Sequence, residues 1–409
     1  MSTAGKVIEC KAGVCWGPGE PIVIEDVQVA PPEAGEVRIQ ILHTGICHTD
    51  EYTRSGKDAE GVFPVILGHE GGGIVESVGE GVTDVKPNVV SANSAQAVRR
   101  TFAVEVSTAS RSEYFNDSPA RPDPPQVRAT QGRGVMPDGT TRFKARGKDI
   151  FHFMGTSTFS QYTVVSQFSV VAIDPAAPLD KVCLLGCGIT TAWGAVTKLQ
   201  GIGTSFPGRP SAKFLTWIPE GSSVAVFGCG CIGLGCINAA RVKKAARIIA
   251  VDTNPAKESW VKKFGGDNVE FINPKDLGDK RIQDHLIEIT DGGLDFTFDA
   301  TGNVGVMRAA LEACHKGWGV STIIGVAPAG HEISTRPFQL VTGRTWRGSA
   351  FGGVKGRTEL PGIVKDYLAG TMLVDEYVTH HRDLKEIQKG FDDMHEGECI
   401  RCVVDMSKA

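Results

Sequence analysis

Residues 224–235 read Val-Ala-Val-Phe-Gly-Cys-Gly-Cys-Ile-Gly-Leu-Gly, and this stretch decides the fold of the middle of the chain. An apolar run of strand type is followed by a glycine pattern that leads into a helical pattern, the order of a dinucleotide-binding fingerprint. Gly228 is expected to form the tight turn, Gly230 to admit a pyrophosphate, and Gly233 to let the helix pack on the strand. The amide groups at the helix start would then face the phosphates.

The next strand supports a nucleotide site. Residues 246–252 (Ala-Arg-Ile-Ile-Ala-Val-Asp) end in Asp252, where a carboxylate binds a ribose 2′-hydroxyl and repels a 2′-phosphate, so NAD is favoured over NADP. Residues 222–240 carry no charge, but their glycines and Asn238 argue against a membrane span. Strand candidates alternate with helical patterns, which indicates a parallel α/β fold; they are residues 224–228, 247–252, 269–272, 295–299 and 320–325.

The composition is that of a globular protein. A length of 409 residues allows two domains, and a net charge of −4 excludes the basic footprint of a nucleic-acid or anionic-membrane binder. The N-terminus has no apolar signal region, so we expect a cytoplasmic location, where the eleven cysteines stay reduced. Residues 5–46 alternate as strands do. Residues 88–126 and 199–217 show no sustained periodicity, and irregular structure is expected in both.

Cys47, His69 and Cys187 are the metal-ligand candidates. Two thiolates, one imidazole and a water form a catalytic zinc set with one open position. Each residue alone also has a simpler interpretation, since a single Cys is often a small buried hydrophobic residue and a single His is often a satisfied core residue. The spacing between the three is long, so their convergence depends on the fold.

The motifs around these residues resemble those of the zinc-dependent medium-chain alcohol dehydrogenases, and in particular the class III enzymes. The resemblance covers nearly the whole chain outside residues 88–126 and 199–217. Besides the glycine fingerprint, the matching segments are residues 45–50 (Gly-Ile-Cys-His-Thr-Asp), 68–70 (Gly-His-Glu), 183–188 (Cys-Leu-Leu-Gly-Cys-Gly), 128–132, 136–140, 302–303, 307–319 and 335–344.

The resemblance implies an α/β protein of two domains. A GroES-like, β-rich catalytic domain is expected over residues 1–188, and a Rossmann domain with a doubly wound parallel sheet over residues 189–345. Residues 346–409 are expected to return to the catalytic domain. Relatives are homodimers, often joined edge to edge through their nucleotide-domain sheets, so a homodimer is expected as well.

The resemblance also implies roles for residues near the metal. It places the catalytic Zn²⁺ on Cys47, His69 and Cys187, with Glu70 beside it and able to exchange with the bound water. Asp50 matches the acid that orients the ligand histidine.

Other positions match the proton path and the coenzyme contacts of the family. Thr49 matches the hydroxyl that takes the substrate proton. Liver-type relatives continue the relay through a His where this chain has Tyr52, so direct exit of the proton to solvent is expected. His48 matches a pyrophosphate contact, and Lys257 and Arg401 match cations that bind the coenzyme.

Three residues match the positions that hold glutathione in class III enzymes. Arg128 matches the arginine that binds a glutathione carboxylate, a task that suits the guanidinium fork. Asp58 and Glu60 resemble the acidic pair expected near the glutathione amine. Gly305 is a departure, because several relatives carry a Lys there; we therefore expect a higher KM for the glutathione adduct.

A second departure concerns the structural zinc lobe of the family, which four cysteines hold between the positions matching Pro87 and Arg128. This chain has no cysteine between Cys47 and Cys183, so a structural zinc site is predicted to be absent and stability to be lower. Two interpretations stay open: a genuine replacement of the lobe, or an error in the gene structure, such as a retained intron, that created residues 88–126 and 199–217.

The function that the resemblance implies is NAD- and zinc-dependent oxidation of S-(hydroxymethyl)glutathione to S-formylglutathione. Reduction of S-nitrosoglutathione and oxidation of long-chain alcohols are implied too. Two alternatives remain: a primary-alcohol dehydrogenase that does not need glutathione, and an inert NAD-binding protein. Turnover that depends on glutathione would argue against the first alternative. NADH binding without turnover would identify the second.

Overall fold

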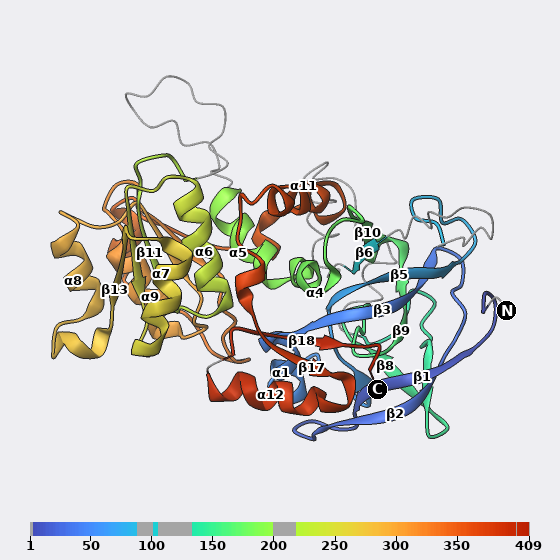
Figure 1. Cartoon of the computed structure of the whole chain (residues 1–409). Helices are drawn as coiled ribbons and strands as arrows, with labels where there is room; N and C mark the ends of the chain where they lie inside the picture. Colours follow the sequence, from blue (N-terminus) through green and yellow to red (C-terminus); the bar gives the residue numbers. More distant parts are fainter. Residues whose placement is uncertain (1–2, 88–100, 105–132, 199–217, 398, 409) are drawn as a thin grey trace. The chain divides into compact units, whose positions relative to one another are not determined.

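The computed structural model describes residues 3–87, 101–104, 133–198, 218–397 and 399–408 (Figure 1). The chain divides into two compact units. The first unit comprises Met1–Cys187, Lys355–Gly370 and Val374–Ala409, and the second comprises Gly188–Val354 and Thr371–Leu373. Strand β16 (Thr345–Gly348) belongs to the sheet of the second unit.

The first unit contains a small closed barrel. Its strands, in spatial order, are β1 (Ile8–Cys15), β2 (Ile22–Val29), β7 (Phe143–Ala145), β8 (Lys148–His152) and β4 (Val65–Ile66). Strands β1 and β2 pair antiparallel, from Ile8 opposite Val29 to Cys15 opposite Ile22. The β beginning expected from the alternation is confirmed.

A larger sheet of the first unit is built around one long strand, β3 (Glu36–Ile46), which pairs with three others. The sheet order among the described strands is β10 (Val170–Ala172), β6 (Thr101–Val104), β5 (Glu70–Val78), β3, β18 (Arg401–Asp405) and β17 (Val378–Asp383), with β9 (Tyr162–Ser166) also on β3.

Strand β6 corrects one expectation. Irregular structure was expected throughout residues 88–126, but Thr101–Val104 pairs with both β5 and β10. Its Thr-Phe-Ala-Val sequence is rich in strand-forming residues, and the tertiary pairing outweighs the polar and proline-rich surroundings. The rest of that segment, and the expected irregular segment 199–217, lie outside the described residues.

The helices of the first unit are short and lie between these strands. They are α1 (His48–Arg54), α4 (Leu179–Val182), α11 (Gly356–Leu368) and α12 (Ile387–Glu396), with 3₁₀ turns η1 (Gln167–Ser169), η2 (Cys183–Gly186), η6 (Asp375–Tyr377) and η7 (Leu384–Glu386).

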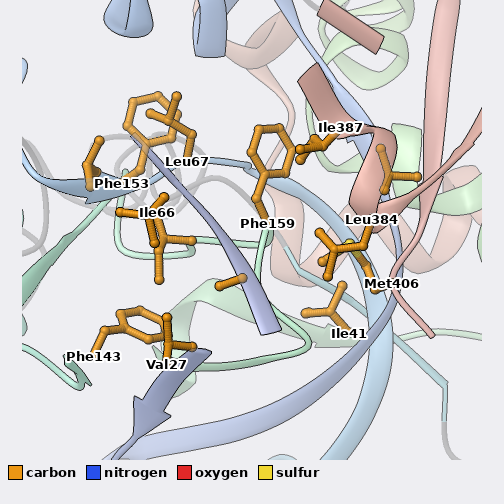
Figure 2. Packing of buried hydrophobic residues seen from close by; sticks show 14 of the residues in the cluster. Val27, Ile41, Ile66, Leu67, Phe143, Phe153, Phe159, Leu384, Ile387 and Met406 are labelled. Carbon is orange, nitrogen blue, oxygen red and sulfur yellow. The ribbon is translucent and has the colours of Figure 1, made fainter. Parts of the chain in front are cut away.

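One hydrophobic core joins the strands of the first unit to its C-terminal elements. Figure 2 shows Val27, Ile66 and Phe143 of the barrel, Phe159 beyond them, and Leu384 near the C-terminal end. Each of these large side chains, when fully buried, contributes roughly 1.5–3 kcal/mol. The core therefore ties residues from both ends of the chain into one unit.

The second unit contains a parallel sheet whose described strands number six. In spatial order they are β13 (Val269–Ile272), β12 (Arg247–Val251), β11 (Ser223–Phe227), β14 (Phe296–Asp299), β15 (Val320–Ile323) and β16. This is the order 3-2-1-4-5-6 of a doubly wound dinucleotide-binding sheet. The expected Rossmann fold is confirmed, as are the five predicted strands before β16.

Helices of the second unit alternate with its strands (Figure 1). They are α5 (Gly188–Thr197), α6 (Cys231–Val242), α7 (Glu258–Gly265), α8 (Ile282–Ile289), α9 (Val304–Ala313) and α10 (Pro337–Val341), with turns η3 (Pro255–Lys257), η4 (Pro274–Leu277) and η5 (Phe351–Gly353). Among the residues described, no single helix is long and apolar enough to cross a membrane, although Leu179–Gly186 and Gly188–Thr197 pass that test together as a bent pair.

Candidate functional site

Four side chains with metal-binding atoms converge in the first unit. Ligand atoms of Cys47, His69, Glu70 and Cys187 all lie within 4.8 Å of one another. The first three residues are buried and Cys187 is half-buried. The structure thus brings together the three predicted ligands and the predicted neighbouring carboxylate.

The pairing of β3 with β5 produces this convergence. Gly45, near the end of β3, lies opposite Glu70, the first residue of β5. Cys47 therefore comes beside the start of β5, where His69 immediately precedes Glu70. A Cβ atom at Gly45 would lie 2.4 Å from Glu70 Oε2, so this position has no room for a side chain. Cys187 follows turn η2, which contacts both strands.

Asp50 holds two of the candidate ligands at once. Its Oδ1 atom lies 3.0 Å from His69 Nδ1 and accepts a hydrogen bond of 3.0 Å from the Gly68 amide. Its Oδ2 atom accepts a hydrogen bond of 3.0 Å from the Cys47 amide. The predicted contact to the histidine is present. The contact to Cys47 was not predicted, although the Cys-x-x-Asp spacing at a helix start is a capping-box signal.

The cluster suits a zinc ion. With Asp50 on His69 Nδ1, the other ring nitrogen, Nε2, is buried and makes no hydrogen bond to any described residue. A hydrogen bond from the Cys187 thiol lowers the pKa of Cys47 well below its usual range, although burial acts in the opposite direction. An unpartnered imidazole nitrogen and a stabilised thiolate are the donors that zinc prefers. These residues therefore fit the metal.

Glu70 makes a buried ion pair behind the cluster. Arg401 Nη2 lies 3.0 Å from Glu70 Oε1, and Arg401 Nη1 donates a hydrogen bond of 2.9 Å to the Ile46 carbonyl. Arg401 is only 4% exposed, and its guanidinium group is paired with Glu70. Its expected contact with the coenzyme stays a prediction.

Helix α1 presents the residues expected to move the proton. Thr49 is half-exposed, and its hydroxyl oxygen lies 3.7 Å from Cys47 Sγ. His48, the expected pyrophosphate contact, is exposed at the helix start, and Tyr52 is half-buried one turn later. Thr49 is thus the hydroxyl of this helix that adjoins the metal cluster.

Of the expected glutathione contacts, two lie in the described part of the chain. Asp58 accepts hydrogen bonds from Thr53 Oγ1 at 2.7 Å and from the Glu60 amide at 3.0 Å. Glu60 is exposed. These contacts order the loop after α1, and both acidic residues lie on this loop. Arg128 lies outside the described residues.

The glycine fingerprint forms the turn between β11 and α6 in the second unit. Gly228 has a φ of +89°, and a Cβ atom there would meet Thr301 Cγ2 at 2.8 Å. A Cβ atom at Gly233 would lie 1.7 Å from the Gly228 carbonyl oxygen, so helix and turn are in close contact. Gly230, by contrast, precedes the first residue of α6 and faces open space. A ligand phosphate could approach the backbone there.

Asp252 lies just beyond β12 and organises this turn. Its Oδ2 atom accepts a hydrogen bond of 2.7 Å from the Cys229 amide, and its Oδ1 atom accepts one of 2.8 Å from the Asn254 amide. Lys257 ends turn η3, five residues after Asp252, and is half-buried. The predicted ribose acid is therefore bound to the glycine turn itself.

Comparison with known families gives two matches. The family described as "Zinc-binding dehydrogenase" matches residues 231–368, and "Alcohol dehydrogenase GroES-like domain" matches residues 33–99. Among solved structures, a benzyl alcohol dehydrogenase from Acinetobacter calcoaceticus has the same fold, with a TM-score of 0.81 at 23% identity over 98% of this chain and 99% of that one.

Full-length relatives are much more similar in sequence. S-(hydroxymethyl)glutathione dehydrogenase of Aspergillus oryzae is 58% identical over 398 residues, covering 97% of this chain and 96% of the relative. Alcohol dehydrogenase class-3 of Dictyostelium discoideum is 56% identical over 410 residues, covering 99% and 100%. This chain therefore belongs to the zinc-dependent medium-chain dehydrogenases, within the class III alcohol dehydrogenases.

Proposed function

We propose that this enzyme oxidises S-(hydroxymethyl)glutathione, the adduct of formaldehyde and glutathione, to S-formylglutathione, with NAD as the hydride acceptor. One observation carries the proposal: the buried Cys47, His69, Glu70 and Cys187 cluster occurs in a chain 58% identical to a relative of that name. The reaction removes a hydride and a proton from the substrate carbon and hydroxyl, and yields NADH.

One zinc ion per chain would be held by Cys47, His69 and Cys187. Glu70 could become the fourth ligand in place of the bound water. When bound, zinc supplies Lewis acidity at the substrate oxygen, and the nicotinamide supplies a hydride acceptor. Asp50 fixes the orientation of His69, and Arg401 neutralises the charge of Glu70. Both contacts hold ligand residues in place before substrate arrives.

Thr49 is the proposed acceptor of the substrate proton. Its hydroxyl lies beside Cys47 and is partly open to solvent, so it can accept a proton on one side and release one on the other. Because Tyr52 replaces the histidine of the longer relay, the proton leaves from Thr49 directly to water. A positioned hydroxyl of this kind contributes to general base catalysis.

The proposed NAD contacts in the second unit are the fingerprint glycines, Asp252 for the ribose, and Lys257 for a phosphate. Gly230 leaves the start of α6 open to an anion, and Asp252 already lies beside the turn. His48 and Arg401, which match coenzyme contacts of the family, are proposed as further phosphate contacts.

Asp58 and Glu60 are proposed to bind the amine of the glutathione part of the substrate. Their carboxylates lie on one ordered loop directly after α1, the helix that carries Thr49. S-nitrosoglutathione shares the same glutathione group, so its reduction by NADH is proposed as a second activity. Long-chain alcohols are proposed as alternative substrates.

A homodimer is proposed on the evidence of the second unit. Strand β16 lies at one end of the described sheet and pairs only with β15 within it. Near β16 in sequence, Phe338 is 68% and Val341 78% exposed, which is unusual for apolar side chains of this size. Sedimentation analysis of the wild type and of Val341→Glu tests this, with a shift from dimer to monomer expected.

A cytosolic location is proposed because the site needs reduced thiols. None of the eleven cysteines, all of which lie among the described residues, forms a disulfide bond. Thiols persist in the reducing cytosol.

The deciding experiment follows NADH formation by purified protein with NAD and formaldehyde, in the presence and absence of glutathione. Turnover that requires glutathione is expected. Equal turnover of simple primary alcohols without glutathione would favour the glutathione-independent alternative. NADH binding with no turnover of either substrate would indicate an inert NAD-binding protein.

A further inference from the structure

Besides Asp50, the segment of residues 153–159 contacts the metal-site histidine and the residue before it. The segment follows β8, and its two ends, Phe153 and Phe159, belong to the hydrophobic core shown in Figure 2. Between them lie three consecutive hydroxyl residues, Thr156, Ser157 and Thr158, all fully buried. Polar side chains are costly to bury unless they are hydrogen-bonded, so their partners indicate what the segment does.

Each of the three hydroxyls has a partner. Ser157 Oγ accepts a hydrogen bond of 2.8 Å from the Phe153 amide, which closes the segment on itself. Thr156 Oγ1 donates to the Phe153 carbonyl at 3.1 Å and to the Gly68 carbonyl at 3.2 Å. Thr158 Oγ1 lies 2.6 Å from Thr44 Oγ1. Two of the three hydroxyls therefore bond outside the segment, one to the residue before His69 and the other to strand β3, which leads to Cys47.

The Gly68 peptide is hydrogen-bonded on both sides. Its carbonyl accepts from the Thr158 amide at 2.9 Å as well as from Thr156, while its own amide donates to Asp50. Gly68 has a φ of +90°, and a Cβ atom there would lie 2.5 Å from Thr158 Oγ1. The residue before His69 is thus held on both its amide and its carbonyl side.

The segment also reaches the His69 ring and the strand before Cys47. The Phe153 ring meets the His69 ring edge-on, with 5.7 Å between centroids. Thr44 lies on β3, three residues before Cys47, so its bond to Thr158 links the segment to the strand that leads to this ligand. Met154 and Ser157 have positive φ values, a strained geometry that surrounding contacts must maintain.

We infer that Thr156 and Thr158 are positioning residues of the metal site: through Gly68 and Thr44 they fix the His69 imidazole relative to Cys47. The inference rests on the proposed metal site. Asp50 holds the ring nitrogen and the amide of Gly68, and the two threonines hold the carbonyl side. Outer contacts of this kind change metal affinity when they are removed.

The test uses Thr156→Val and Thr158→Val, which keep the branched shape and remove the hydroxyl. Each variant is expected to release zinc to a chromophoric chelator about 10-fold faster than the wild type. In cobalt-substituted protein, the visible absorption bands are expected to shift, because ligand geometry changes. Thr158→Ser keeps the hydroxyl and is expected to restore both properties.

Ser160→Ala is the matched control. Ser160 is equally buried and lies two residues further on, but its hydroxyl is 3.7 Å from Cys10 Sγ and bonds neither to Gly68 nor to Thr44. Its zinc release and cobalt spectrum are expected to match the wild type. Thr44→Val removes the bond to Thr158 from the other side, and serves if Thr158→Val does not fold.

Wild-type zinc release and an unchanged cobalt spectrum in both valine variants would overturn the inference, as would an equal effect of Ser160→Ala. Failure of the proposed function has a different signature. If the wild-type protein binds one zinc ion but does not oxidise the glutathione adduct, the proposed substrate is wrong. The positioning role is then still decided by the zinc release of the variants. A wild-type protein that binds no zinc would overturn both.

Discussion

Replacing Asp50 tests the arrangement of the metal site most directly. This carboxylate is fully buried and accepts from the Cys47 amide, the Gly68 amide and His69 Nδ1. Asp50→Asn keeps the shape, and its single oxygen can still serve two of the three donors. Asp50→Ala removes both acceptor oxygens and with them all three bonds. The two variants therefore form a graded series at one position.

The expected losses follow from these bonds. In Asp50→Asn, one bond and the negative charge are lost, and we expect about 10-fold weaker zinc binding, equivalent to about 1.4 kcal/mol. In Asp50→Ala, three buried donors lose their acceptor at a cost of about 1 kcal/mol or more each. We expect about 100-fold weaker zinc binding and a loss of about 3 kcal/mol in unfolding free energy.

Zinc content after dialysis against graded chelator concentrations measures the affinity, and denaturant unfolding of the metal-free proteins measures the stability. Asp149→Ala is the control, because that side chain is 66% exposed and lies on β8, which carries none of the metal ligands. Its zinc affinity should equal that of the wild type. If Asp50→Ala kept wild-type affinity, or if the Asn variant were the weaker of the two, the assigned role of Asp50 would be wrong.

Four further changes have defined outcomes. Arg401→Gln breaks the buried ion pair with Glu70 and should lower the unfolding free energy by about 3–5 kcal/mol in urea titrations; unchanged stability would refute it. Burial lowers the pKa of His152 from 6.5 to about 3, so its share of stability is intact above about pH 6.5 and lost as the pH falls toward 3. Against His152→Gln, the wild type should therefore lose about 1.4 kcal/mol more per pH unit in that window, and parallel curves would contradict this. Asp252→Asn should weaken NADH binding about 10-fold relative to NADPH in fluorescence titrations. Gly305 is exposed, and a Cβ atom there would lie 3.1 Å from Asn303 Oδ1, so a small shift of that side chain admits Gly305→Lys. The variant should lower the KM for the glutathione adduct up to about fivefold, whereas an unchanged KM would count against a binding role.

The nucleotide-binding unit was the most predictable part of the fold. Its strands are short apolar runs buried in a parallel sheet, and the glycine pattern is a local signal that needs no knowledge of distant residues. The predicted strand at residues 269–272 coincides with β13, and that at 247–252 differs from β12 only at its end. The fold of this unit therefore follows from its sequence with little tertiary information.

The metal site was predictable only through the resemblance to relatives. Cys47, His69 and Cys187 come together through the register of β3 with β5 and the packing of η2, and neither is encoded in any short stretch. Arg401 illustrates what was missed, since its partner Glu70 lies 331 residues away in sequence. The sequence did not single out Thr156 and Thr158, because hydroxyl composition does not reveal burial.

The place of β18 in the sheet has a consequence for biosynthesis. Residues 401–405 pair with the strand that leads to Cys47, and Arg401 neutralises Glu70 beside it. A ribosome that has made the first ligands must therefore translate the whole nucleotide-binding unit before this strand emerges. That inserted unit can fold while synthesis continues. A nascent chain would complete its metal-binding unit only at the end of translation, so messages truncated before codon 401 should yield a folded coenzyme unit attached to an incomplete metal-binding unit.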